Sequence, residues 1–396
     1  MTRTGTRLGL AGLLGLGFVF VHSMFGSRVQ TTDFSVPLPG ITSDEQARFN
    51  AGKDAFEEVE GIADGLGPVF NEVSCVACHN VGGTGGGNSK LEFRFGRITN
   101  GLFDPLTQFG GSLQQLQGIG DLGDGCEFHA ESVGGGANVQ AGRRTTPLFG
   151  LGLVDAVAGS TLEALAAVEP AATRGRVNRA MNLSTGKLAV SKFGWKAQVP
   201  TLFQFAGDAY LNEMGITNPQ FPNESCMNGD CDYTNRCNPA PGLNDDGTDV
   251  REFRDFMTFL APPARGPITG AVLAGEAVFV AIGCANCHTP VLKTAANAAE
   301  PSLRNRVFQP FSDFLLHDMG SLGDHIGGQG QAGLREMRTQ PLWGLHLLTT
   351  FLHDGRASTI EGAVAAHDGQ AVGARNRFNN LPAQQKANIM AFLKSL

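Results

Sequence analysis

The chain has 396 residues, 42% of them hydrophobic and 17% charged, and its formal net charge is −7. This length allows two domains, and the thinly spread charge, with no run of Lys or Arg, argues against nucleic acid as a partner. The 54 glycines predict long loops wrapped around something large and apolar.

The N-terminal segment has the layout of an export signal. Arg3 and Arg7 precede an apolar run over residues 8–21, and residues 21–23 offer an acceptable cleavage site. The run is short for a helix that spans a bilayer. We predict that residues 1–23 are a signal peptide and that the protein is periplasmic. An uncleaved anchor is the alternative, and it would be the only contact with a membrane.

Two pentapeptides, residues 75–79 and 284–288, share the pattern Cys-x-x-Cys-His, which is typical of c-type haem attachment. Cysteines at this spacing lie about one helical turn apart, so both thiols reach vinyl groups on one porphyrin edge, and the adjacent histidine binds the iron. A redox dithiol or half a zinc site would explain one motif, but two motifs favour two c-type haems. The attachments are predicted at Cys75, Cys78, Cys284 and Cys287, and the iron ligands at His79 and His288.

Four further cysteines predict two disulfides in an oxidising compartment. They are Cys126, Cys226, Cys231 and Cys237, and the sequence does not decide their pairing. A zinc site is the alternative, but its spacings are loose and no histidine lies close to residues 226–237.

A proline-rich joint at residues 260–267 divides the chain into two halves. Each half begins near a haem motif and ends in a segment with helical apolar spacing. We predict a mainly α fold of two cytochrome c-like domains with long loops, residues 34–262 and 267–396, each enclosing one haem. The two apolar stripes consist of Val250, Phe253, Met257 and Leu260, and of Ile389, Phe392, Leu393 and Leu396.

The halves also share two internal landmarks in the same order. Residues 144–151 (RTTPLFGL) match residues 338–345 (RTQPLWGL), and residues 160–169 match residues 358–367. Both members of the second pair begin with Ser-x-x-Glu, a capping box that starts a helix. The matches indicate an internal duplication, with residues 226–237 as an insertion in the first half.

The duplication points to a second axial ligand for one haem. Ile360, Ala363, Val364 and His367 follow helical spacing, which places His367 on an apolar stripe. A lone histidine there is usually a core residue, but an iron that needs a sixth ligand favours ligation. We predict that His288 and His367 hold the second haem between two imidazoles.

Glu169 stands at the matching position of the first half. Carboxylates are poor haem ligands, so the first haem is expected to keep an open position, where Glu169 would act as a general acid and base beside peroxide or dioxygen. The alternative is a solvent-facing Glu169, because Pro170 ends the helix. Met214 and His129 are rival sixth ligands for this haem.

Further residues are candidate haem contacts. Trp195 would pack on a porphyrin or relay electrons between the haems, and Lys196 would hold a propionate. His353 and Arg356 are expected to meet propionates, with a polar loop as the alternative. Residues 244–249 (NDDGTD) are a candidate calcium loop, although a solvated turn is the more common outcome.

The chain resembles bacterial dihaem oxidoreductases of the peroxidase type, in a branch also labelled "thiol oxidoreductase", which are related to dihaem cytochrome c peroxidases and MauG-type enzymes. Those peroxidases carry a distal histidine soon after the first haem motif, where this chain has the glycine-rich residues 81–87, and commonly a methionine where it has His367. Both departures imply an open first haem and a closed second one. The segments that carry the resemblance are residues 70–79, 193–197, 317–320, 338–344 and 351–356.

The resemblance implies a haem-dependent oxidoreductase. Electrons from a small redox protein or a quinol-linked donor would enter at the second haem and pass to the first, where peroxide or another small oxidant is reduced. One alternative is a dihaem electron carrier without substrate chemistry. Another is an oxygenase or protein-modifying enzyme that uses high-valent iron.

Overall fold

Helices form the frame of the structure, with 35% of the residues in helices and 17% in strands. The helical bias agrees with the predicted mainly α fold, whereas the strands were not predicted. The computed structural model describes residues 33–396, so the predicted signal peptide lies outside the described range. The helices are α1 (Ser43–Glu57), α2 (Leu151–Asp155), α3 (Gly159–Val168), α4 (Leu202–Met214), α5 (Cys231–Cys237), α6 (Thr248–Phe259), α7 (Gly270–Ala281), α8 (Ile360–Ala366), α9 (Val372–Asn379) and α10 (Ala383–Leu393).

The strands pair in antiparallel ladders, and the largest sheet centres on β2 (Leu91–Thr99). This strand pairs with β3 (Leu102–Asp104), β4 (Leu113–Gln114) and β8 (Val139–Arg144). The other ladders join β1 (Val69–Phe70) to β5 (Gln117–Gly118), β6 (Gly120–Gly123) to β7 (Cys126–Phe128), β9 (Asn178–Asn182) to β10 (Lys187–Ser191), β11 (Leu292–Lys293) to β12 (Val307–Phe308), and β13 (Leu316–Asp318) to β14 (Glu336–Arg338).

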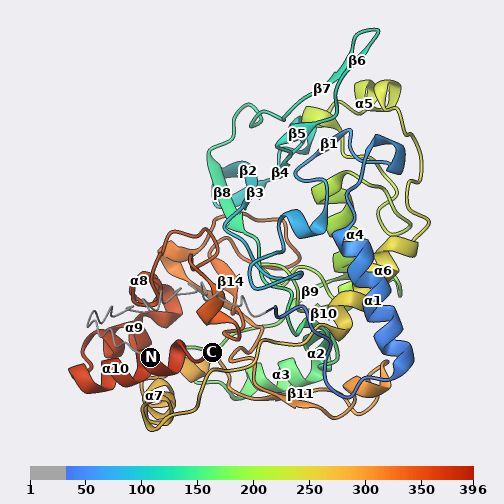
Figure 1. The fold of residues 1–396 in the computed structure, drawn as a ribbon. Coiled ribbons are helices and arrows are strands. Elements are labelled where there is room, and N and C mark those ends of the chain that lie inside the picture. The colour runs from blue at the N-terminus through green and yellow to red at the C-terminus, as the bar shows by residue number, and fades with distance from the viewer. Residues whose placement is uncertain (1–32) are drawn as a thin grey trace, which may run out of the picture. The chain divides into compact units, whose positions relative to one another are not determined.

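The first and last helices of each half cross at close range. α1 packs against α6, and α7 packs against α10 (Figure 1). Gly52 permits the first crossing, because a Cβ there would lie 2.2 Å from the carbonyl oxygen of Glu252. Gly275 permits the second, where a Cβ would lie 2.0 Å from the carbonyl oxygen of Asn388. Both predicted apolar stripes, which end α6 and α10, are buried.

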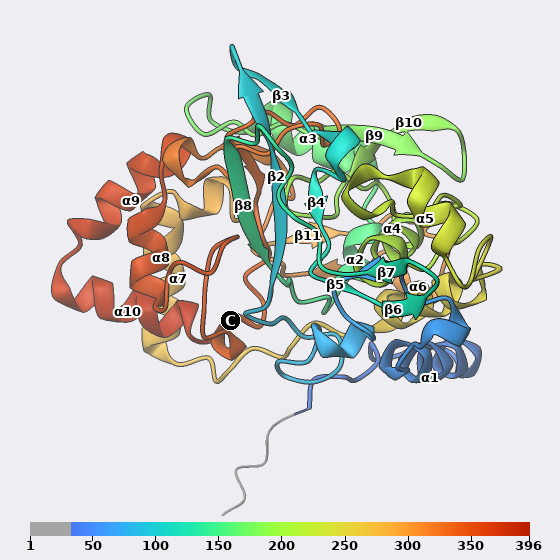
Figure 2. The ribbon, with the colours of Figure 1, turned by 90° about the horizontal axis from the view of Figure 1, so that it is seen from above.

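The two helix pairs lie on opposite sides of the central sheet. Figure 2 shows α7, α8, α9 and α10 on one side of β2 and β8, and α1, α4 and α6 on the other. Ion pairs also join the two halves, for example between Arg48 and Glu300 at 2.5 Å. Residues 33–396 form one compact unit, and the boundary between residues 262 and 267 stays a prediction. No helix in the described range is long and apolar enough to cross a bilayer.

The repeated Arg-Thr-x-Pro-Leu segments adopt the same turn in both halves. Gly150 and Gly344 have φ angles of 70° and 71°, and each begins a short helix, α2 in the first half and a 3₁₀ turn at Leu345–Leu347 in the second. These left-handed φ values favour glycine, because a Cβ is strained there. The local structure therefore supports the predicted duplication.

The predicted capping boxes are wrong in both halves. α3 begins at Gly159, one residue before the predicted cap, and Ala158 at its N-cap has no side chain that could accept a hydrogen bond. In the second half Thr359 caps α8, and its hydroxyl accepts a hydrogen bond from the Gly362 amide at 3.0 Å. The N-cap of α3 therefore lies two residues before the predicted serine, and that of α8 lies one residue after it.

The four remaining cysteines form two disulfides, as predicted. One joins Cys126 of β7 to Cys237 at the end of α5, and the other joins Cys226 to Cys231. All four sulfur atoms are used, which excludes the alternative zinc site. The first disulfide ties the inserted loop to the β6–β7 ladder.

We expect Gly275→Ala to destabilise the C-terminal half, because the added Cβ must push α7 away from the Asn388 carbonyl group. Overpacking of this kind costs about 1–3 kcal/mol, so thermal denaturation should show a lower Tm. Gly270→Ala is the control, because it lies in the same helix and a Cβ there meets nothing within 4 Å. Equal Tm values for the two variants would contradict the close crossing.

Candidate functional site

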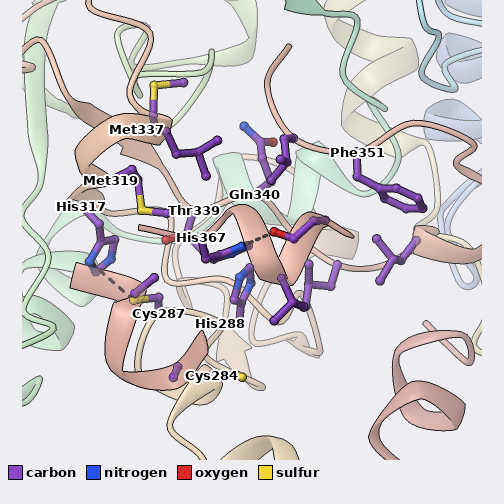
Figure 3. Close-up of a pocket in the computed structure, with 18 of the residues that line it drawn as sticks. Cys284, Cys287, His288, His317, Met319, Met337, Thr339, Gln340, Phe351 and His367 are labelled. Atoms are coloured by element: carbon purple, nitrogen blue, oxygen red, sulfur yellow. Dashed lines mark hydrogen bonds between the residues drawn. The ribbon is translucent and has the colours of Figure 1, made fainter. Parts of the chain in front are cut away.

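The second haem motif opens into a cavity of about 240 Å³ in the C-terminal half (Figure 3). The rings of His288 and His367 lie across this cavity from each other, with their centroids 6.5 Å apart. A metal ion between two imidazoles needs about 2 Å for each metal–nitrogen bond and roughly half a ring on either side. The observed separation fits one iron between the two histidines.

Hydrogen bonds orient both imidazoles for ligation through Nε2. The Nδ1–H of His288 donates to the Phe311 carbonyl oxygen at 2.9 Å, and that of His367 donates to the Ala363 carbonyl oxygen at 2.8 Å. Such bonds fix the tautomer and the ring orientation of a metal ligand. Burial lowers the pKa of His288 to about 4 and also lowers the pKa of His367, so both rings are neutral, as ligation requires.

The thiols of this motif line the same cavity. A 3₁₀ turn at Cys284–Asn286 presents Cys284 and Cys287 toward it, and burial raises the pKa of Cys284 to about 12. Within residues 33–396 the free cysteines are those of the two Cys-x-x-Cys-His motifs. Two thiols beside two opposed imidazoles are the donor set that a covalently attached haem requires.

The first haem motif opens into a larger cavity of about 430 Å³, lined by Cys75, Cys78 and His79. The Nδ1–H of His79 donates to the Gly86 carbonyl oxygen at 3.1 Å, and burial lowers the pKa of the ring to about 4. Residues 81–87 thus supply an orienting acceptor for the proximal imidazole. This donor set also fits a haem, held by one imidazole.

A phenylalanine packs against the motif histidine in each half. The ring centroids of Phe56 and His79 are 5.9 Å apart, and those of Phe279 and His288 are 6.2 Å apart. Each phenylalanine lies one helical turn after the glycine of its crossing. The sequence analysis missed these two residues, although an Ala-Gly-x-x-x-Phe repeat in α1 and α7 was a readable signal.

No second histidine of the described residues lines the first cavity. His129 is exposed and does not reach it. Met214 lines the cavity from the end of α4 and is itself buried in the hydrophobic core. The two cavities therefore differ in their candidate sixth ligands. Among the described residues, a second imidazole lies in the second cavity and not in the first.

Acidic and basic side chains line the first cavity instead. Glu92 and Arg94 of β2 form an ion pair there. Burial raises the pKa of Asp208 to about 6 and the pKa of Glu213 to about 7. Asn71 donates a hydrogen bond to Glu213 at 2.9 Å. The sequence analysis missed these carboxylates, because β2 was not predicted and charges on α4 are typical of an exposed helix face.

Glu169 does not line the first cavity, and its burial excludes the solvent-facing alternative. It follows α3, is buried, and accepts a hydrogen bond from the Gly175 amide at 2.7 Å. Its neighbours are Asp313 and His317, which lie beside Cys287 of the second motif, and burial raises its pKa to about 7. The chain after Pro170 turns the carboxylate toward this group instead of toward the first haem motif.

Lys196 and Arg356 do not line either cavity, which argues against the predicted propionate contacts. Lys196 is fully buried, with its Nζ atom 2.9 Å from Asp324, and it also donates to three carbonyl oxygens. Arg356 is half exposed and pairs with Asp354. Each cation therefore has a partner elsewhere.

Trp195 and His353 do line haem cavities. His353 lies in the wall of the second cavity, whereas Arg144, Thr146 and Trp195 line both cavities. The Nε1–H of Trp195 donates to the Arg144 carbonyl oxygen at 2.9 Å. Arg144, Thr146 and Trp195 form the shared wall, which separates the two cavities.

The predicted calcium loop caps a helix instead of gathering its carboxylates. Asp246 accepts hydrogen bonds from the amide and hydroxyl of Thr248, and Asp245 accepts one from the Asp249 amide. This arrangement at the start of α6 fits the alternative of a polar turn. Among residues 33–396, one group of three potential metal ligands occurs, formed by Cys287, Asp313 and His317, and it competes with haem attachment for Cys287.

Residues 133–396 match a family described as "Di-haem oxidoreductase, putative peroxidase". The chain belongs to this family. The dihaem oxidoreductase match includes the second haem motif and the shared wall, and it begins after the first motif. Membership implies two haems and an oxidoreductase that uses a peroxide-type oxidant. A comparison with curated protein sequences gave no match.

Several solved structures are similar to this dihaem oxidoreductase over most of their length. The diheme peroxidase BthA from Burkholderia thailandensis E264 is 14% identical, over 88% of this chain and 86% of that one, with a TM-score of 0.40. A MauG-like protein associated with microbial copper homeostasis is 15% identical, over 91% and 92%, with a TM-score of 0.40. Hydrazine synthase from Kuenenia stuttgartiensis is 15% identical, over 99% and 100%, with a TM-score of 0.37. No residue role follows from likenesses this loose.

We expect His367→Ala to convert only the second haem from low spin to high spin, because the substitution removes the imidazole opposite His288. Optical and EPR spectra of the oxidised protein measure this change. Met319→Leu is the control, because Met319 lines the same cavity and its thioether is an alternative donor. A spectrum that changes in the Met319 variant and not in the His367 variant would reverse the ligand assignment.

Proposed function

We propose that this dihaem oxidoreductase reduces peroxide or a related small oxidant at the first haem site and receives its electrons at the second. The observation that carries this proposal is the asymmetry of the cavities. An imidazole lies opposite His288 at 6.5 Å, and no histidine among residues 33–396 lies opposite His79. When bound, the haems supply the redox chemistry, and an iron without a sixth protein ligand supplies a place for the oxidant.

The second site is suited to electron transfer. His288 and His367 would occupy both axial positions, so a substrate has no coordination position there. Trp195 lies in the shared wall, and its indole is held by the Arg144 carbonyl oxygen. This aromatic ring supports the proposal that electrons from a small redox protein or a quinol-linked donor cross the wall to the first site.

Asp208 and Glu213 would supply protons at the first site. Reduction of one peroxide to two waters consumes two electrons and two protons, so a peroxidase needs proton donors beside the oxidant. Both carboxyl groups line the cavity, and burial raises the pKa of Asp208 to about 6 and that of Glu213 to about 7, so a fraction of each group is protonated near neutral pH. They take the general-acid role that the sequence analysis gave to Glu169.

The disulfides support export to the periplasm. Cys126–Cys237 and Cys226–Cys231 require an oxidising compartment to form and persist. Covalent haem attachment through the two free-cysteine motifs agrees with the same location. Export is therefore part of the proposal, and the predicted signal peptide would direct it.

A dihaem electron carrier is the second candidate. The observation that favours it is the thioether of Met214, which lines the first cavity and would close the iron if it were a ligand. A carrier of this kind would have two six-coordinate haems and no site for an oxidant.

The spin states of the purified oxidised protein decide between these functions. We expect one low-spin and one high-spin haem, with the high-spin signal altered by cyanide or peroxide, because only one site has two imidazoles. Two low-spin haems that bind neither ligand in either redox state would support the carrier. Met214→Leu serves as a control, since it should leave the low-spin signal of an enzyme unchanged and should remove one low-spin haem from a carrier.

We expect peroxide turnover to fall as the pH rises through about 7, because Glu213 donates only when it is protonated and burial raises its pKa to about 7. Glu213→Gln should slow turnover by about 10²-fold and weaken this pH dependence, with Asp208, Glu92 and Arg94 as the remaining charged groups around it. Glu169→Gln is the control, because that buried carboxyl group has a similar pKa outside the cavity. A Glu213 variant with the wild-type rate and pH profile would remove it from the reaction.

A further inference from the structure

Two buried arginines occupy equivalent positions in the duplicated halves. Arg144 and Arg338 each begin a copy of the repeated Arg-Thr-x-Pro-Leu segment, and each is 6% exposed. Arg144 lines both haem cavities, and Arg338 lines the second. Conserving a buried cation in both halves of a duplication needs a reason, because a guanidinium is costly to bury without an acceptor.

The backbone on both sides fixes the place of Arg144. Its amide donates to the His353 carbonyl oxygen at 2.5 Å, and its carbonyl oxygen accepts from the Trp195 indole at 2.9 Å. Both neighbours line the second cavity. The side chain therefore projects from a firmly held point of the shared wall.

The guanidinium of Arg144 lacks an anionic partner among residues 33–396. Its Nε atom is buried and has no hydrogen-bond partner among residues 33–396. Burial alone lowers its pKa, to about 10, with no carboxylate opposing the shift. An anion in the cavity would supply the hydrogen-bond acceptor and the counter-charge that this guanidinium lacks.

The adjacent arginine shows that the chain supplies a carboxylate where one is needed. Arg143 donates to Asp324 through Nε at 2.8 Å and Nη2 at 2.5 Å, and it also donates to Gln329. Lys196 contacts the same carboxylate. Arg144 thus differs from its neighbour in β8, whose guanidinium has a carboxylate partner.

Arg338 is partly satisfied, by uncharged acceptors. Its Nε donates to the Gly194 carbonyl oxygen at 2.8 Å, and its Nη2 donates to Gln340 at 2.7 Å. Its Nη1 is buried without a partner in the described range. The Nη1 group of Arg338 is thus left to donate to a ligand of the second cavity.

We propose that Arg144 is a shared anchor for carboxylate groups of both haems, and that Arg338 anchors a carboxylate of the second haem alone. Each haem carries two propionates, and a guanidinium presents its N–H donors in a planar fork that matches carboxylates. The inference rests on the proposed occupancy of both cavities by haem. It replaces Lys196 and Arg356, whose charges are paired elsewhere.

A shared cation would couple the two redox centres. A positive charge near an iron stabilises the reduced state, which carries one positive charge fewer than the oxidised state. Loss of the charge of Arg144 therefore lowers the midpoint potentials of both haems, whereas loss of the charge of Arg338 lowers only that of the second.

Redox titration of the purified holoprotein, followed optically, tests this inference. We expect Arg144→Gln to shift both midpoints to lower potential, Arg338→Gln to shift only the second, and the half-exposed control Arg356→Gln to shift neither. Arg144→Lys keeps the charge and should leave both midpoints close to their wild-type values. A first-haem midpoint that is unchanged in Arg144→Gln would overturn the shared anchor.

Two further measurements keep the test decisive. If Arg144→Gln does not fold, resonance Raman spectra of Arg144→Lys should show altered propionate modes for both haems, and unaltered modes overturn the anchor. Haem content of the wild-type protein separates the two proposals. Fewer than two haems per chain contradicts the proposed function itself, whereas two bound haems with unmoved midpoints contradict only the role of Arg144.

Discussion

The close crossing of two helices in each half is the constraint on which the haem cavities depend. Gly52 and Gly275 let α1 and α7 approach the backbone of their partner helices, because any side chain would meet a carbonyl oxygen there. Phe56 and Phe279, one turn further along, then pack against the histidine of the haem motif in their own half. The backbone carbonyl groups that accept from the Nδ1 atoms complete the orientation. The motif histidine of each half is thereby aimed into a cavity.

The predicted duplication accounts for two such sites, and differences at the ends of two helices make them unequal. α8 ends at His367, which is turned into the second cavity while its Nδ1 bonds the Ala363 carbonyl oxygen. α3 ends at Glu169, and the Gly175 amide holds that carboxylate beside the second motif. The first cavity has no opposed imidazole among residues 33–396, and carboxylates of β2 and α4 line it instead. Unequal coordination from equal starting units is the physical basis of the proposed division between electron entry and oxidant reduction.

The shared wall connects these unequal sites. Asp324 pairs with two buried cations, Arg143 and Lys196. Arg144 projects from the same strand without such a partner, beside the indole of Trp195. The shared wall thus presents an arginine and an aromatic ring at the cavity surface, and the ion cluster around Asp324 lies next to it in the chain and in space. A structure of this kind can position two cofactors and set their charge environment through few residues.

The sequence by itself determined the features that depend on local spacing. These were the two haem motifs, the duplicated segments, the presence of two disulfides and the helical register that places His367 on an apolar face. Only the tertiary structure decided which polar side chains reach the cavities. Lys196 follows Trp195 directly, yet it is bound by Asp324, a partner distant in sequence. The positions of Glu169, Asp208 and Arg144 could not be predicted from the sequence for the same reason. Burial and long-range pairing decide whether a charge is satisfied by the protein or left for a ligand, and no local sequence pattern encodes them.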